Sequence, residues 1–463
     1  MTGECITNKV VNSVSIDQAF SIRNLNGLFE SDREKGGDLE EQYLPSAYAL
    51  RTHIYELKKT RSILRHKHRT GAVTPEFYTL RNQRLNSVIT GRKGQHGDIV
   101  EKELGKIAKK ILSKDFRVEL SIHPKPVGGK TVYGVGKDLA QILAIRFVQN
   151  ILKDVYDIKM PARDILVAQV KALAMDGSPK FILRADVESF YESIQHKDLL
   201  ESIHQSPALS VLVKRIITRL LVDYKALSGA EKGLPRGVGV SAYLSEIYLA
   251  YLDADVRRHS EVFYYARYVD DMILMFAPAQ KKSAETYLTS FGELLGRKGL
   301  ALNEKTQVLN LLDEQRGKFT YLGYEFDVSS SSRGVRMSTA RLKKYKDRIE
   351  KSFSDYNAKC AFIPSKAADE LVMRCMFLTG NMRLFNRKSN AFIGVYFSNK
   401  FITDFSQLHG LDRYFSAKVS RLTNSRLKRK LSRMSFEKGF TQKVFRNFNT
   451  KKLSEISRGW KHA

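Results

Sequence analysis

Residues 264–274 read YYARYVDDMIL, and this stretch decides the fold. Two adjacent acids, Asp270 and Asp271, lie among aromatic and apolar residues that favour strands. Neighbouring carboxylates repel each other, and burying either one without a partner is costly. Residues 262–276 therefore predict a β-hairpin whose turn carries two carboxylates, which a divalent cation would neutralise. Taken alone, the stretch also fits an exposed turn with two solvated acids.

A third acid is expected, because one acidic pair seldom suffices to hold a metal ion. Asp186 meets this expectation, since it closes the apolar run FILRAD, which predicts a buried strand over 181–187. Asp186 and Asp270 are so far apart in sequence that only the fold can bring them together. Hard carboxylate oxygens suit Mg²⁺, with Mn²⁺ as an alternative, and three acids suit a site with two such ions.

Length and charge set the class of protein. The chain has 463 residues, of which 43% are hydrophobic, which predicts two or three packed subdomains. The net charge of +29 predicts a polyanionic partner, nucleic acid first and an anionic membrane surface second. No apolar run is long enough to span a membrane, so no membrane partner is expected. Three scattered cysteines indicate neither a disulfide framework nor a zinc site, so a cytoplasmic location is expected.

Basic residues are concentrated near both ends of the chain. Residues 46–95 hold eleven Lys or Arg against two Glu, with aromatic residues interleaved, which predicts basic helices that contact a phosphate backbone. A solvated helix face is the alternative. The tail 411–463 holds fifteen Lys or Arg against three acids and predicts helices, and its cluster SRLKRKLSR (425–433) is a second candidate contact. Between these ends, 241–257 and 283–298 have helical patterns and 319–327 predicts a strand or hairpin.

Seven segments in order resemble the reverse transcriptases. YVDD (268–271) resembles their Tyr-x-Asp-Asp motif, and ADVESFYESI (185–194) resembles the motif that carries their first catalytic acid. Five further segments are similar to the family in the same order along roughly 120–330: HPKPVGGKTVYGV (123–135), IRFVQNIL (145–152), EKGLPRGVGVSAYLSEIYL (231–249), GLALNEKTQVL (299–309) and FTYLGYEF (319–326). One motif would be a weak signal, whereas seven in order are a specific one.

The resemblance implies an α+β fold of the right-hand polymerase type. Fingers, a palm with an antiparallel sheet and a helical thumb are expected. The implied division is an N-terminal helical basic extension (1–95), fingers (96–180), a palm with the catalytic motifs (181–330) and a helical, basic thumb module (331–463).

The resemblance also implies roles at the reaction centre. Asp186, Asp270 and Asp271 would bind the metal ions, and the backbone carbonyl of Val187 would complete the second metal site. Lys305 would be the general acid that protonates the leaving pyrophosphate.

Further residues would bind the incoming nucleotide. Tyr191 matches the position of an aromatic ring under the sugar, where it would exclude a 2′-hydroxyl. Lys125 and Lys130 match positions that contact the triphosphate, although Arg is commoner at the second, so this grip is looser or shared. Pro235, Arg236 and Gly237 would form the turn against the nascent base pair. Most relatives have Gln in place of Arg236, so its role stays open between a phosphate contact and an outward orientation.

The expected function is RNA-directed DNA synthesis from deoxynucleoside triphosphates on an RNA template. Tyr191 and YVDD argue against the main alternative, an RNA-dependent RNA polymerase, and the complete set of acids argues against a silent nucleic-acid scaffold. The residues of these motifs most resemble those of free-standing bacterial enzymes, and this resemblance favours a defence-associated role with a cognate non-coding RNA. A retron or mobile-element enzyme is the alternative, and a homo-oligomer or a partner protein stays open.

Overall fold

A computed structural model describes residues 20–34, 37–277, 283–313, 316–329, 331–384 and 391–460. The structure confirms the expected α+β class, with helices and antiparallel sheets. Over these residues, no helix combines the length and apolar character needed to cross a lipid bilayer. Cys5 and the first part of the N-terminal extension lie outside the described residues.

The chain divides into two compact units, and it passes between them three times. Unit 1 comprises Met1–Lys159 and Tyr191–Leu249, and unit 2 comprises Met160–Phe190 and Ala250–Ala463. The expected four-part division stays a prediction, and helix α5 (Pro75–Leu112) runs through its first boundary at residue 95.

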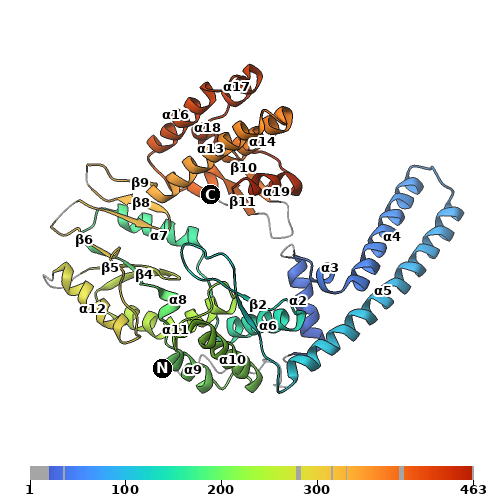
Figure 1. Cartoon of the computed structure of the whole chain (residues 1–463), viewed down its shortest axis with the longest axis horizontal. Helices are drawn as coiled ribbons and strands as arrows, with labels where there is room; N and C mark the ends of the chain where they lie inside the picture. The colour runs from blue at the N-terminus through green and yellow to red at the C-terminus, as the bar shows by residue number, and fades with distance from the viewer. Residues whose placement is uncertain are drawn as a thin grey trace. The chain divides into compact units, whose positions relative to one another are not determined.

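Unit 1 is mostly helical. Its longest helices, α4 (Pro45–Arg69) and α5, lie side by side as an antiparallel pair that we call the arm (Figure 1). This pair confirms the helices predicted for 46–95. The other elements of unit 1 are α2 (Ile22–Glu34), α3 (Leu39–Tyr43), β1 (Leu120–Ile122), β2 (Tyr133–Val135), α6 (Leu139–Val155), α9 (His196–Gln205) and α10 (Val211–Ser228). Helices α8 (Phe190–Ser193) and α11 (Val240–Arg258) connect the two units in sequence.

An antiparallel sheet of four strands forms the centre of unit 2. Its order is β4–β5–β3–β6, so the central strands are β5 (Asp271–Phe276) and β3 (Phe181–Asp186), with β4 (Val262–Tyr268) and β6 (Gln307–Asn310) at the edges. The central strands consist mostly of buried apolar residues, because both of their edges are paired. The predicted hairpin over 262–276 and the predicted strand over 181–187 are both confirmed.

A second sheet and a group of helices complete unit 2. The sheet has the order β7 (Lys318–Tyr321), β8 (Tyr324–Asp327) and β9 (Gly334–Met337), and β7–β8 is the hairpin predicted over 319–327. Helix α12 (Ala284–Gly296) confirms the helix predicted over 283–298. The helical C-terminal part also contains a strand pair that the sequence did not predict, β10 (Asn381–Leu384) and β11 (Ala391–Gly394). The remaining helices are α7 (Arg163–Met175), α13 (Thr339–Lys359), α14 (Pro364–Leu378), α15 (Val395–Asn399), α16 (Ser406–Ser420), α17 (Ser425–Leu431), α18 (Phe436–Thr441) and α19 (Thr450–Arg458).

Candidate functional site

Two of the three predicted metal-binding acids are direct neighbours in the sheet of unit 2. Asp186 is the last residue of β3 and pairs in register with Asp271, the first residue of β5. Each side chain is 20% exposed, so the two carboxylates lie at the end of the sheet where solvent reaches them. The acids that are far apart in sequence therefore converge.

Arg184 partly offsets the charge of this pair, and it was not predicted from the sequence. Its guanidinium Nη2 lies 3.1 Å from Oδ1 of Asp271 and 4.0 Å from Oδ1 of Asp186, and its Nη1 donates to the carbonyl of Lys305 at 3.2 Å. Arg184 lies two residues before Asp186 on β3, and alternate residues of a strand point to the same face. That alternation is the signal by which Arg184 could have been found.

The turn between β4 and β5 carries Asp270 in a strained backbone. Val269 has a φ of +61°, a left-handed conformation that is unfavourable for a β-branched residue. The side chain of Arg267 supports this turn, because its Nη1 donates to the carbonyl of Val269 at 3.3 Å. Arg267 is in turn fixed by Asp253 of α11, with contacts of 2.6 Å and 2.9 Å. This bidentate pair is 8% and 14% exposed and anchors the hairpin to the helix.

The predicted Lys305 lies on a loop that is tied to the end of β3. The amide of Asn303 donates to the carbonyl of Asp186 at 2.8 Å, and that of Glu188 donates to the carbonyl of Ala301 at 2.9 Å. These two bonds flank Val187, and neither uses its carbonyl. The Lys305 side chain is exposed, so its amine is accessible to a solute.

The donor set fits a divalent cation. Carboxylate oxygens are the hard ligands that Mg²⁺ prefers, and Oδ1 of Asp271 is a buried oxygen that accepts no hydrogen bond. Within the described ranges, no group of three or more His, Cys, Asp or Glu side chains has the spacing of a formed metal site. The cation beside the carboxylates in this structure is the guanidinium of Arg184.

The fingers residues predicted for the triphosphate lie on a tight hairpin turn of unit 1. Val127 and Lys130 exchange backbone hydrogen bonds of 3.0 and 3.2 Å around Gly128 and Gly129. Both glycines have positive φ (60° and 75°), as the central residues of a type I′ turn require. Lys125 precedes this turn on the exposed loop.

The predicted 235–237 turn packs directly against the neighbouring strand β2. Pro235 is buried, and the carbonyl of Arg236 accepts a hydrogen bond of 2.7 Å from the amide of Tyr133. Gly237 has a φ of +97°, and a Cβ at this position would lie 2.8 Å from the carbonyl oxygen of Tyr133. Only glycine fits both constraints.

The Arg236 side chain has a partner that was not predicted from the sequence. It donates to both carboxylate oxygens of Glu192 at 3.1–3.2 Å, and its guanidinium lies over the ring of Tyr191, 5.1 Å from the centroid. Lys130 also contacts Glu192, at 3.2 Å. Two residues predicted to bind the nucleotide, Lys130 and Arg236, therefore share one carboxylate. The sequence signal for this contact is that Arg236 stands where the family usually has Gln, because the added positive charge calls for an acidic partner.

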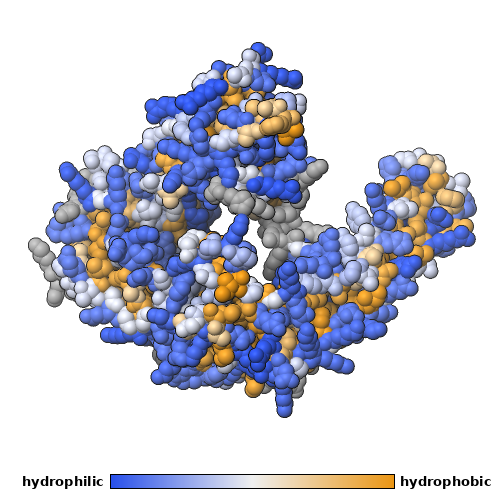
Figure 2. Space-filling model, viewed as in Figure 1, coloured by the Kyte–Doolittle hydropathy of each residue, from blue (hydrophilic) through white to orange (hydrophobic). Residues whose placement is uncertain are grey.

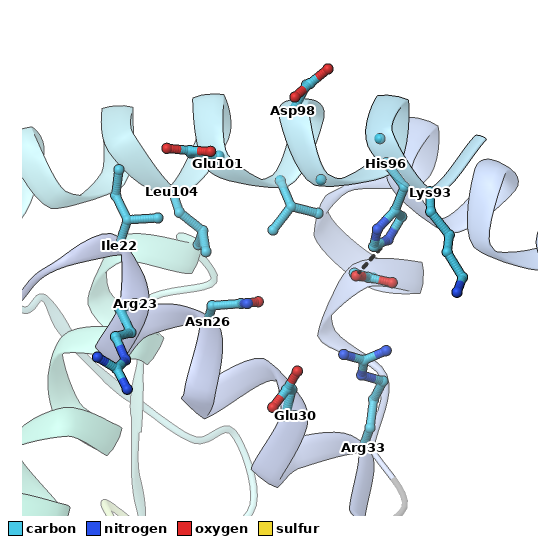
Figure 3. A pocket seen from close by; sticks show the side chains of 14 residues that line it. Ile22, Arg23, Asn26, Glu30, Arg33, Lys93, His96, Asp98, Glu101 and Leu104 are labelled. Carbon is cyan, nitrogen blue, oxygen red and sulfur yellow. Dashed lines mark hydrogen bonds and ion pairs between the residues drawn. The ribbon is translucent and has the colours of Figure 1, made fainter. Parts of the chain in front are cut away.

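A separate cavity of about 520 Å³ lies among α2, α3 and α5 at the base of the arm (Figure 3). It contains none of the predicted site residues, and basic side chains such as Arg33 and Lys93 alternate round it with acidic ones such as Glu30. Glu40, 3% exposed, lies 3.1 Å from Nε2 of His96 and 2.6 Å from Nη1 of Arg51. These contacts join α3, α4 and α5, so the cavity belongs to the joint that fixes the arm.

Comparison with known proteins defines the class of the domain. Residues 111–326 match the family model described as reverse transcriptase (RNA-dependent DNA polymerase). The match confirms the expected polymerase fold over this part of the chain, and RNA-dependent DNA polymerase is the activity of the matched family. All the predicted site residues lie within the matched range.

Solved structures of telomerase share a distant likeness with the chain. One from Candida albicans, in complex with a fragment of telomeric RNA, is 11% identical with a TM-score of 0.38, covering 73% of this chain and 70% of that one. One from Candida tropicalis, truncated from its C-terminal domain, is 14% identical with a TM-score of 0.34, covering 49% of this chain. The chain spans 56% of the length of this truncated telomerase. Such distant superpositions do not bear on function. No curated protein sequence matches the chain.

The pKa of Asp271 makes the stability of the metal-free protein dependent on pH. This pKa is raised to about 6, mainly by burial and to a smaller extent by the nearby carboxylates of Asp186 and Asp270. The Arg184 guanidinium and the Leu322 amide act in the opposite direction. Because the folded pKa exceeds the unfolded value, the protonated carboxyl stabilises the fold fully below pH of about 4, and this contribution is lost as pH rises through about 6.

We therefore expect the metal-free wild type to lose stability relative to Asp271→Asn between pH of about 4 and 6. The measurement is the free energy of unfolding in urea with EDTA at each pH. Parallel pH profiles for the two proteins would contradict the raised pKa.

Proposed function

We propose that the protein is a template-dependent DNA polymerase that copies RNA from deoxynucleoside triphosphates. The convergence of Asp186 and Asp271 on adjacent strands, inside the reverse transcriptase domain, is the observation that carries this proposal. The chemistry that Mg²⁺ supplies when bound, with Mn²⁺ as an alternative, is activation of a hydroxyl nucleophile and neutralisation of phosphate charge.

Different residues of the chain would bind the metal ions, the leaving group and the nucleotide. Asp186, Asp270 and Asp271 would hold the ions in unit 2, together with the Val187 carbonyl, and the exposed Lys305 amine would protonate the leaving pyrophosphate. In unit 1, Lys125 and Lys130 would bind the triphosphate. Pro235, Arg236 and Gly237 would form the rigid turn against the nascent base pair, and Tyr191 would exclude a ribose 2′-hydroxyl.

Replacing Asp270 by Asn should abolish DNA synthesis. Loss of one metal-binding carboxylate should lower the rate by more than about a hundredfold in a primer-extension assay with an RNA template and Mg²⁺. Asp255→Asn makes the same change at a half-exposed carboxylate of α11 and should retain activity. Undiminished synthesis by the Asp270→Asn protein would overturn the site assignment.

Replacing Tyr191 by Ala should admit ribonucleotides. The smaller side chain leaves room for a 2′-hydroxyl, so the ratio of kcat/KM for a ribonucleotide to that for the deoxynucleotide should rise at least about tenfold. Tyr251→Ala, at a ring that is 64% exposed on α11, serves as the matched control. An unchanged ratio would remove Tyr191 from the sugar gate.

The arm is proposed as an RNA contact. Between residues 57 and 97 it carries ten Lys or Arg and one acid, Glu76, and eight of the basic side chains are exposed. Tyr55 (69% exposed) and Phe77 (53%) offer rings on which unpaired bases can stack. Figure 2 accordingly shows hydrophilic and hydrophobic side chains intermixed along the arm. This composition fits an RNA better than a protein partner, because phosphates would meet the basic side chains.

Neutralising the arm should weaken RNA binding and its dependence on salt. The triple variant Lys58→Gln, Lys59→Gln and Lys67→Gln should lower the slope of log affinity against log salt by about 0.7–0.9 for each phosphate that the arm no longer neutralises. Lys102→Gln, Lys106→Gln and Lys109→Gln form a matched triple on α5, where acids are interspersed. The measurement is fluorescence anisotropy with RNA that copurifies with the wild type. Equal weakening by both triples would show that the basic part of the arm, residues 57–97, is no specific contact.

The identity of that RNA bears on the biological role. Antiviral defence in a bacterium, with a cognate non-coding RNA as template, is proposed from the sequence resemblance alone. Sequencing the copurified RNA tests it. One defined structured RNA would support the defence or retron alternatives, whereas an intron RNA would indicate a mobile element.

A further inference from the structure

Glu192 lies at the centre of the nucleotide-binding residues in unit 1, although it bears the wrong charge for contact with a triphosphate. Its Oε1 accepts from Nε and Nη2 of Arg236, and its Oε2 accepts from Nη2 of Arg236 and from Nζ of Lys130, all at 3.1–3.2 Å. A single carboxylate thus contacts Arg236 through both of its oxygens and Lys130 through Oε2.

The backbone holds Glu192 in this place. The amide of Leu234 donates to the carbonyl of Tyr191 at 2.7 Å, and the amide of Gly233 donates to the carbonyl of Ile194 at 2.7 Å. A Cβ on Gly233, whose φ is +100°, would lie 3.2 Å from Cα of Glu192. The two segments therefore pack backbone against backbone, and the carboxylate and the guanidinium are presented to each other by the fold.

The contact is accessible and can be exchanged. The side chains of Glu192, Lys130 and Arg236 are 36%, 38% and 33% exposed. Ion pairs at such exposure contribute little net free energy, because water screens them. A triphosphate carries more negative charge than one carboxylate, so it can displace Glu192 from Lys130.

We propose that Glu192 is a specificity-determining anion of the nucleotide site. In the nucleotide-free protein it takes the place of a phosphate group beside Lys130, and it holds the Arg236 guanidinium over the ring of Tyr191. An incoming triphosphate must compete with Glu192 for Lys130, while Arg236 retains its carboxylate partner. Glu192 thereby lowers the affinity for weakly charged phosphate compounds and sets the affinity for the triphosphate. The inference rests on the proposed function of these residues.

The test is triphosphate binding rather than synthesis. Inorganic tripolyphosphate and deoxyadenosine triphosphate are titrated into the full chain by isothermal titration calorimetry with EDTA present. Removing the competing charge in Glu192→Gln should tighten binding about two- to fivefold, as expected for the loss of the one partly exposed ion pair, Glu192–Lys130, for which the triphosphate competes. Glu231→Gln removes an equal charge from a side chain that pairs with Lys225, and should bind as the wild type does. Unchanged or weaker binding by Glu192→Gln would overturn the proposal.

Two comparisons separate competition from a structural effect. The gain from Glu192→Gln should vanish in a Lys130→Gln background, because Lys130 is the cation for which the two anions compete. The double variant Glu192→Gln/Arg236→Gln should bind the triphosphate more tightly than Arg236→Gln alone. The double variant carries neither charge of the Glu192–Arg236 pair, so it serves as the test if Glu192→Gln alone fails to fold. Equal affinity within that pair of variants would also overturn the proposal.

DNA synthesis by the same proteins distinguishes the inference from the function on which it rests. If Glu192→Gln binds triphosphate more tightly but even the wild type makes no DNA, the proposed polymerase function is rejected and the role of Glu192 as a competing anion is kept. If the wild type makes DNA but Glu192→Gln binds triphosphate no more tightly, only the role of Glu192 as a competing anion is rejected.

Discussion

The pairing of Asp186 with Asp271 across two central strands is the constraint on which the site depends. The register of β3 and β5 brings two like charges to the same end of the sheet. Their repulsion and partial burial disfavour this arrangement, as the raised pKa of Asp271 indicates. A cation nearby therefore stabilises the ionised pair, and the guanidinium of Arg184 provides one.

The surrounding residues hold the carboxylates in this unfavourable arrangement. The strained turn at Val269 is supported by Arg267, which Asp253 anchors to α11. Unit 1 shows the same principle with opposite sign, because the cations Lys130 and Arg236 share the carboxylate of Glu192. In each unit, residues predicted to bind a charged ligand are neutralised by an internal group of the charge that the ligand would bring.

The sequence predicted the elements of the site better than its side-chain contacts. The hairpin around Asp270 and the strand that ends at Asp186 followed from apolar runs interrupted by acids, which is a local signal. Arg184 and Glu192 were missed because their partners lie elsewhere in the sequence. The contact of Arg184 with Asp271 requires the strand register, and that of Glu192 with Arg236 requires the backbone bonds between the 191–194 and 233–234 segments. Strand pair β10–β11 was also missed, within a region whose composition is otherwise helical.

The most direct test of the central claim is the binding of Mn²⁺ to the metal-free chain, followed by electron paramagnetic resonance. If Asp186 and Asp271 form one cation site, Asp186→Asn and Asp271→Asn should each abolish the tightly bound Mn²⁺ signal, although the residues lie on different strands. Tight Mn²⁺ binding that survives in both variants would contradict the account.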